Sequence, residues 1–530
     1  MFEKGEIISL GKINIKKIDI WYWVIFSFIG LITFSSLIIF ELSNPDAIWN
    51  NLYYKEGWRW EAQLGRYMIR FFQLIFGNVI NSPSFTILGI LLLALICVIV
   101  NKIFELDGIM AILGGAILML SPAIVSTLTY YYCSLYYIIA YLLAVITSWI
   151  ICKCKNWLVA FVGMGILCIS MAIYQAYIGI ILILGLLYVT FLLLDKNQDL
   201  KNIFNRVLYM LVVIAGGIIV YLVTNKFYQK MLDIAPVSDR GFSEMGNIPL
   251  ENLSTLLKNC YVYTYQYFFS KEMINNDYGF KKVLHFIFFL LLIFVLVREV
   301  VKSEKKWYYR ILFLISVSLV PLGLMSITIA GSGVSIYDTT GVIMLPTMNY
   351  VYVLLIILLH RLQKVGNALP SYLKWCGSAI ILLIVISMFN ICISAQSYQK
   401  HMMNKMDYLS KSIVNDIERL VDHSDEYTIC FVGEFENGNY PELYPELKES
   451  ISWLTASHGT VWKTFLGTQE CWRMYIKQYT GKEYRRCQEE EYKEIIKSNF
   501  FNSMNNYPDT NSIAVYNENV IVIRLSDVKN

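Results

Sequence analysis

The stretch SPSFTILGILLLALICVIVN, residues 82–101, decides the fold class. It contains no charged residue, and as a helix it is long enough to cross the roughly 30 Å hydrocarbon core of a bilayer. Similar apolar runs recur along the chain, and we predict about eleven transmembrane helices from them. They lie at 19–41, 82–101, 108–127, 131–151, 157–175, 177–194, 207–224, 283–299, 311–330, 341–360 and 375–395.

The composition agrees with this interpretation. Of the 530 residues, 56% are hydrophobic and 16% are charged, whereas a soluble protein carries about 25% charged residues. The sequence therefore predicts a polytopic α-helical membrane protein. A net charge of +4 is too small to indicate nucleic acid, so we expect no such partner.

The lysines and arginines between the predicted spans are distributed unequally. If the spans alternate, these residues all fall on one side, and the connections near 127–131, 175–177 and 331–340 on the other side contain none. The positive-inside rule then predicts a cytoplasmic N-terminus and, with an odd number of spans, an extracytoplasmic C-terminus. The residues are Lys4, Lys12, Lys16, Lys17, Lys102, Lys153, Lys155, Lys196, Lys201, Arg206, Lys302, Lys305, Lys306, Arg310, Arg361, Lys364 and Lys374.

The chain divides into a transmembrane domain, residues 1–395, and a small extracytoplasmic α/β domain, residues 396–530. Long loops at 42–81 and 225–282 lie on the external side with the second domain. In that domain the spacing predicts a helix over 406–421, a strand over 428–435 and a hairpin formed by 512–516 and 520–525. Cys471 and Cys487 form either a disulfide or two free thiols, since sequence gives no distance between them.

The first external loop combines acids, indoles and arginines in SNPDAIWNNLYYKEGWRWEAQLGR, residues 43–66. One interpretation is structural, because tryptophan and tyrosine are enriched at membrane interfaces. The other is an active site. There Asp46 or Glu61 would accept a proton from a hydroxyl, and Arg66 with Arg59 would bind a phosphate. Trp58 and Trp60 would give a sugar an apolar platform.

Two further external segments add polar groups. LTYYYCSLYY (128–137) includes Tyr130, and IYQAYIG (173–179) includes Tyr174 and Gln175. An interfacial belt explains a single tyrosine equally well, whereas an amide at a tight connection needs a partner, either a neighbouring helix or a ligand. The histidines form no metal-binding pattern, so we expect no cofactor, with a carboxylate-bound divalent cation left open.

NPD after the first span, E…LGR (Glu61 and 64–66), SPAIVSTLTYYYCSLYYIIAYLLAV and IYQAYIG together resemble the bacterial membrane glucosyltransferases of the Gtr type II kind. The resemblance covers about residues 20–400 and implies a GT-C architecture in a bacterial plasma membrane. It also implies a polyprenyl-phosphate-linked sugar donor, commonly glucose, and a cell-surface glycan acceptor such as O-antigen, capsule or teichoic acid.

The resemblance implies that the acidic base in the first external loop is Asp46, with Glu61 second. Asp46 departs from the paired acids common in this class, because no acid is adjacent to it. Three other classes compete with this hypothesis: a flippase or transporter of lipid-linked saccharides, a polysaccharide polymerase or ligase, and a non-enzymatic scaffold. A transporter would carry charges near the bilayer midplane, and the predicted spans contain almost none.

Overall fold

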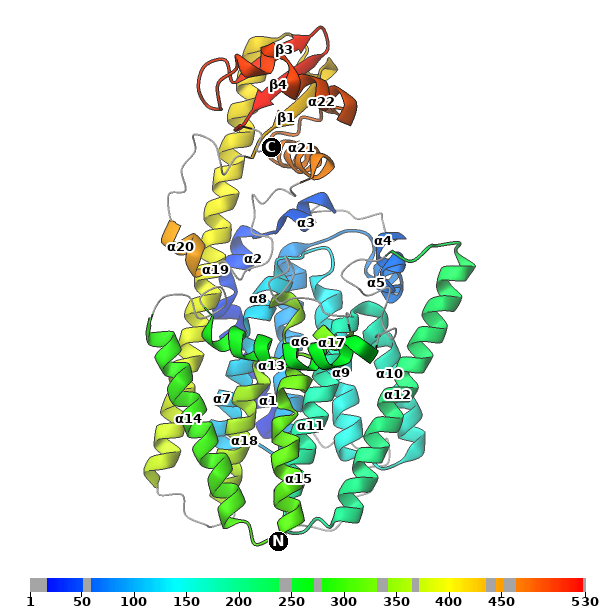
Figure 1. Cartoon of the computed structure of the whole chain (residues 1–530), viewed down its shortest axis with the longest axis vertical. Helices are drawn as coiled ribbons and strands as arrows, with labels where there is room; N and C mark the ends of the chain where they lie inside the picture. Colours follow the sequence, from blue (N-terminus) through cyan, green and yellow to red (C-terminus); the bar gives the residue numbers. More distant parts are fainter. Residues whose placement is uncertain are drawn as a thin grey trace.

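The computed structural model of the chain describes residues 17–50, 59–237, 250–270, 279–330, 342–364, 371–434, 445–451 and 464–527. A helical bundle forms the larger part, and a small sheet stands beyond one end of it, beside the end of the long helix α19 (Figure 1). The helices before the sheet are α1 (Lys17–Thr33), α2 (Ser35–Phe40), α3 (Pro45–Trp49), α4 (Arg59–Gln63), α5 (Met68–Phe76), α6 (Ser82–Phe104), α7 (Gly108–Met119), α8 (Pro122–Leu128), α9 (Ser134–Lys153), α10 (Trp157–Ile173), η1 (Gln175–Tyr177), α11 (Ile178–Leu194), α12 (Leu200–Met231), η3 (Leu250–Asn252), α13 (Leu253–Phe269), α14 (Gly279–Lys302), α15 (Trp307–Ser318), α16 (Val320–Leu324), α17 (Ser326–Ala330), η4 (Val342–Met344), α18 (Tyr350–Lys364) and α19 (Ser371–Leu420).

The helices confirm a polytopic membrane protein. In the described part of the chain, seven helices are long and apolar enough to cross a membrane, or nine if each of two bent pairs forms one span. Two shorter apolar helices, Trp157–Ile173 and Tyr350–Leu362, coincide with two further predicted spans. The total of eleven crossings stays a prediction.

Two spans predicted as continuous are bent. The segments Lys17–Thr33 and Ser35–Trp49 meet at 55°, and α7 meets α8 at 46°. The second bend has a local cause, because Pro122 occupies the first turn of α8. Proline has no N–H to donate and is favoured where a helix begins. The predicted span 311–330 is likewise divided into α15, α16 and α17.

The predicted external loops contain helices. Residues 42–81 include α3, α4 and α5, and within 225–282 α12 continues to Met231 and α13 follows. Figure 1 shows α13 lying across the direction of the long helices, and it packs against α14, α16 and α17.

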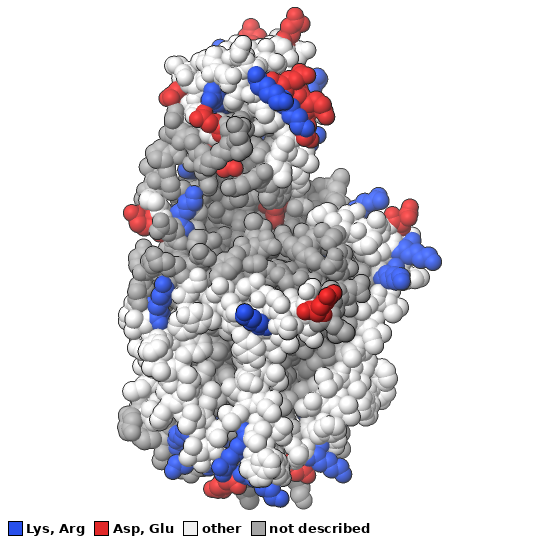
Figure 2. Space-filling view, viewed as in Figure 1, with Lys and Arg blue, Asp and Glu red and all other residues white. Residues whose placement is uncertain are grey.

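Among the residues that the structure describes, the cations that the sequence placed on one side lie at one end of the bundle, near α1's first turn. Lys4, Lys12 and Lys16 fall outside the described residues. Ion pairs join the connections there: Lys102–Asp19 (2.8 Å), Lys153–Glu105 (2.8 Å) and Lys196–Glu304 (2.6 Å). On the face shown in Figure 2, lysines and arginines gather at this end, few charged side chains lie over the middle of the bundle, and many more lie towards the opposite end and on the sheet at the top. We call this the basic end and the opposite end, which carries α3, the α3 end.

The sheet has the strand order β2-β1-β4-β3, in which β1 runs parallel to β2 and β4, and β3 pairs antiparallel with β4. The predicted strand and hairpin are confirmed. We call residues 424–434 and 464–527 the sheet region. Its elements, with α20 between its two parts, are η5 (Ser424–Glu426), β1 (Thr428–Val432), α20 (Pro445–Ser450), α21 (Phe465–Thr480), β2 (Arg485–Arg486), α22 (Glu489–Lys497), α23 (Asn499–Asn502), β3 (Ile513–Asn517) and β4 (Val520–Arg524).

Helix α19 joins the bundle to the sheet region without interruption. The predicted span 375–395 and the predicted helix 406–421 are parts of this one helix of 50 residues, about 75 Å long at 1.5 Å per residue. The predicted domain boundary after residue 395 therefore falls inside a helix, and independent folding of the sheet region stays a prediction.

The sheet separates Cys471 from Cys487. Alternate residues of β1 point to opposite faces: Phe431 belongs to the apolar cluster that contains Cys471 of α21, and Cys430 to the cluster that contains Cys487. A disulfide between Cys471 and Cys487 is thereby excluded. All eleven cysteines are thiols in the structure.

Candidate active site

The NPD sequence begins the short helix α3. The Asn44 side chain accepts a hydrogen bond from Ala47 N at 2.9 Å, Pro45 occupies the first turn, and Asp46 lies beside it. Asparagine at the N-cap, proline at N1 and an acid in the first turn are all favoured there. The motif thus has a structural role, and it leaves the Asp46 side chain half-buried at the α3 end.

The LGR sequence ends the short helix α4. Arg66 N donates to Glu61 O at 2.7 Å and Gly65 N donates to Ala62 O at 3.1 Å, the pair of bonds that defines a Schellman C-cap. Gly65 has φ +77°, and a Cβ there would lie 2.5 Å from the Tyr221 hydroxyl. Glycine is therefore required by both the backbone conformation and the close approach of α12.

Gln175 and Tyr221 hold this turn from two other elements. Gln175 Nε2 donates to Leu64 O at 2.6 Å and to the Tyr221 hydroxyl at 2.9 Å, and that hydroxyl donates to Gly65 O at 3.2 Å. The sequence left open whether the Gln175 amide meets a helix or a ligand. In the structure Gln175 is 3% exposed. Its amide nitrogen donates to the LGR turn and to Tyr221 of α12, so a neighbouring helix is one of its partners.

The turn places the Arg66 guanidinium on a pair of tyrosines. Tyr137 and Tyr174 stack with ring centroids 4.2 Å apart. Arg66 Nη1 donates to the Tyr137 hydroxyl at 3.0 Å, and Arg66 Cζ lies 5.0 Å from the Tyr174 ring centroid. Burial alone lowers the pKa of Arg66, but Tyr137, Tyr174 and Tyr132 raise it, and the net direction is upward. Arg66 is thus a permanent cation on an aromatic surface.

Both candidate acids lie near the same tyrosine, Tyr132, and affect its pKa. The pKa of Tyr132, in the turn before α9, is raised well above its usual value, chiefly by burial and additionally by the negative charges of Asp46 and Glu61. Because Tyr132 also acts on Arg66, the acids, the arginine and the tyrosines occupy one region of the α3 end. Glu61 is 5% exposed there.

No contact with Arg66 is described for the remaining predicted site residues. Trp58 lies outside the described residues. Arg59 and Trp60 are exposed on α4, Trp60 by 53%. Tyr130 is buried in the turn that precedes α9, where its carbonyl accepts from Ser134 N at 2.7 Å.

Three contributors are not among the predicted site residues: Tyr132, Tyr137 and Tyr221. The first two lie in the segment 128–137 that the sequence placed on the external face, where no sequence feature distinguishes them from Tyr130. Tyr221 lies within an apolar span, and no feature of the adjacent sequence indicates that it contacts a loop more than 150 residues away in the chain.

The sheet region packs directly over α3. Helix α21 contacts α3, and the residues that meet between them are Pro45, Ile48, Trp49, Cys471, Met474 and Tyr475. The position of Asp46 therefore depends on both the bundle and the sheet region.

No metal-binding cluster of three or more His, Cys, Asp or Glu side chains occurs among the residues that the structure describes. A reaction without metal stays a prediction.

Comparison with known proteins gives one family. The family model described as Glucosyl transferase GtrII matches residues 34–358, a range that includes α3, α4, the tyrosine pair and Tyr221. No curated protein and no solved structure matches the chain.

A match over this range decides between the competing classes. It favours an enzyme that transfers a sugar over a transporter or a scaffold. The chain belongs to the GtrII glucosyl transferase family and is a polytopic membrane glycosyltransferase.

Proposed function

We propose that this glycosyltransferase moves a glucosyl group from a polyprenyl-phosphate carrier to a hydroxyl of a cell-surface glycan such as O-antigen, capsule or teichoic acid. One observation carries the proposal: Arg66 is a half-buried cation set on a tyrosine pair, with two carboxylates in the same region. A lipid-linked donor keeps its chain in the bilayer and its phosphate at the boundary. An arginine at the end of a membrane bundle is placed to meet that phosphate.

The proposed orientation follows from charge. Lysines and arginines gather at the basic end, and cytoplasmic connections carry an excess of these residues. With the basic end in the cytoplasm of a bacterium, the α3 end and the sheet region lie outside the plasma membrane. The enzyme would then belong to the GT-C class, which acts at the outer leaflet.

Arg66 is proposed to bind the phosphate. One of its N–H groups donates to Tyr137, and within the described residues its Nε has no hydrogen-bond partner. A guanidinium offers five donors in a planar fork that matches phosphate oxygens. The charge on the carrier phosphate grows as the bond to the sugar breaks, so this contact strengthens towards the transition state.

Asp46 is proposed as the base, with Glu61 as the second carboxylate. Asp46 is the more accessible of the two, since it is half-buried and Glu61 is 5% exposed. In a single displacement, Asp46 takes the proton of the acceptor hydroxyl, and the oxygen bonds to the anomeric carbon. The bond from that carbon to the phosphate oxygen breaks, and the carrier phosphate leaves with the electron pair.

The other residues have supporting roles in this proposal. Gln175 positions the LGR turn, and the ring of Tyr174 packs against the Arg66 guanidinium. The exposed Trp60, with Arg59, Trp58 and Tyr130, and the segments 225–282 and 396–530 would bind the acceptor glycan.

The test is a transfer assay with purified protein in lipid, radiolabelled polyprenyl-phosphate glucose and host glycan. Wild type is expected to transfer label, and Asp46→Asn to lose it by about 100-fold or more, because a general base contributes about 10²–10⁴-fold. EDTA is expected to leave the rate unchanged. Glu304→Gln, an acid with a 71% exposed side chain at the basic end, is the matched control.

Each outcome has a separate meaning. Absence of transfer from any polyprenyl-phosphate sugar would refute the proposed donor. A fully active Asp46→Asn with an inactive Glu61→Gln would move the base to Glu61.

A further inference from the structure

Two cysteines lie opposite each other in neighbouring strands of the sheet region. Strands β1 and β2 pair in parallel, with Thr428 opposite Arg485 and Ile429 opposite Arg486. Cys487 N donates to Ile429 O at 3.2 Å, so the ladder continues past the end of β2. The next pair in this register is Cys430 and Cys487. Neighbouring strands lie about 4.8 Å apart, within the Cα separation that a disulfide bridges.

The two side chains point into the same apolar cluster. Cys430 and Cys487 are both 0% exposed and share this cluster with Ile495 and Phe501, on the sheet face opposite α21. The neighbouring Cys487 thiol, followed by burial, raises the pKa of the Cys430 thiol. The strand register and the shared apolar cluster therefore place the two thiols beside each other.

We propose that Cys430 and Cys487 form a disulfide bond in the native protein. The inference rests on the proposed orientation, which places the sheet region in a compartment where disulfides persist. The oxidant is a disulfide-containing protein or small molecule. The two cysteine thiols lose two protons and two electrons, a sulfur–sulfur bond forms between them, and the oxidant disulfide is cleaved to two thiols.

The bond forms before the sheet closes. Exchange needs a thiolate and access for the oxidant. In the folded chain both cysteines are buried and the pKa of Cys430 is raised, so the reduced, folded protein reacts slowly.

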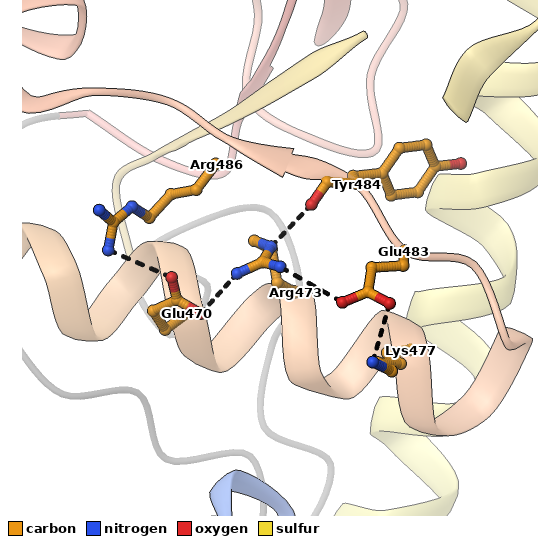
Figure 3. Close-up of polar contacts among 6 residues, drawn as sticks. All are labelled: Glu470, Arg473, Lys477, Glu483, Tyr484 and Arg486. Carbon is orange, nitrogen blue, oxygen red and sulfur yellow. Dashed lines mark hydrogen bonds and ion pairs between the residues drawn. The ribbon is translucent and has the colours of Figure 1, made fainter. Parts of the chain in front are cut away.

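The bond would secure the part of the sheet region that covers α3. Strand β2 has only two residues and lies at the sheet edge. Otherwise Arg486 of β2 is joined to Glu470 of α21 by an ion pair of 3.2 Å (Figure 3). The residues just before β2 also contact α21: Arg473 Nε donates to Tyr484 O (2.8 Å), and Glu483 pairs with Arg473 (3.7 Å) and Lys477 (2.8 Å). Within α21, Arg473 pairs with Glu470 (2.7 Å). A covalent link from β1 to the end of β2 closes the loop that contains α21, the helix that packs on α3.

The experiment is peptide mapping of the full-length protein. Cells are lysed into denaturant with N-ethylmaleimide, and the protein is digested without reduction. We expect one linked peptide pair containing Cys430 and Cys487, and an alkylated Cys471. Cys430→Ser should release Cys487 for alkylation, whereas the matched control Cys471→Ser should keep the linked pair.

Alkylation of both Cys430 and Cys487 in the wild type, or a link of either to another cysteine, would overturn the proposal. A second sample, reduced in denaturant and then refolded into detergent with oxidised glutathione while both thiols are accessible, identifies the reason for a failure. A bond formed only in that sample would count against the proposed orientation, and no bond in either sample would count against the geometry. The glucosyl-transfer assay is independent of both results.

Discussion

Arg66 owes its position to residues far from it in the chain. Tyr137 on α9 accepts one of its hydrogen bonds, and Tyr174 lies under its guanidinium. The turn that carries Arg66 is held by Gln175 and by Tyr221 of α12. Few of these contacts follow from local sequence, so the position of the Arg66 side chain is set only when the bundle folds.

If Arg66 binds the carrier phosphate, its geometry matters as well as its charge. Arg66→Met is expected to lower kcat/KM about 100-fold, because a hydrogen bond to a charged group contributes about 1.5–3 kcal/mol. Arg66→Lys keeps the charge and loses the planar fork, and should lie between Arg66→Met and wild type. The measurement is the transfer rate at subsaturating donor. Lys201→Met, at an exposed cation of the basic end, is the control. Equal rates for Arg66→Met and wild type would contradict the phosphate role.

Gly65 tests the turn itself. Gly65→Ala places a methyl group 2.5 Å from the Tyr221 hydroxyl at φ +77°. The backbone alone costs about 1–2 kcal/mol, and the contact adds to this. We expect a lower Tm and a lower transfer rate, measured on the same preparation in lipid.

A second glycine separates the two causes. Gly481 has a similar φ of +73° with nothing within 4 Å of its Cβ position, so Gly481→Ala should show the backbone cost alone. Adding Tyr221→Phe to Gly65→Ala removes the hydroxyl that the methyl group meets and should restore part of the loss. If the double variant is no better than Gly65→Ala, the close approach of Tyr221 is not the cause.

At the scale of elements, the contact between α3 and α21 joins the candidate site to the sheet region. Helix α3 has only five residues, and isolated helices of that length are not stable in water. Its order must come from its N-cap and from packing. Ile48, 5% exposed, lies against α21 residues such as Tyr475.

Ile48→Asp is therefore expected to release α3 from α21. An unpaired carboxylate in this apolar contact costs about 2–4 kcal/mol. Hydrogen exchange should show faster exchange in both helices, and the transfer rate should fall because Asp46 loses its position. Ile48→Met keeps the volume and should cost less than about 1.5 kcal/mol. Faster exchange in α3 with an unchanged rate would show that Asp46 acts independently of this packing.

At the scale of the whole molecule, the sequence predicted what depends on composition and short-range spacing. Each apolar run coincides with a helix or a group of helices, since about twenty apolar residues leave few alternatives. The hairpin followed from two short apolar runs, 512–516 and 520–525, on either side of an Asn-Glu-Asn turn. The break at Pro122, the helix α13 and the contact of Arg66 with Tyr137 were not predicted. The first depends on one proline whose effect varies with its surroundings, and the other two on tertiary packing.

The orientation of the whole chain is the last prediction. If the basic end faces the cytoplasm and the number of crossings is odd, alkaline phosphatase fused after the full-length chain is expected to be active, because it matures only outside. A green fluorescent protein at that terminus is expected to stay dark. The same reporters at the N-terminus should give the opposite pattern. The physical reason is the set of ion-paired lysines at the basic end, among them Lys102, Lys153 and Lys196, which are retained on the side where insertion begins. A fluorescent C-terminal fusion with inactive phosphatase would place Arg66 and Asp46 in the cytoplasm. The donor would then have to be sought among cytoplasmic sugar carriers.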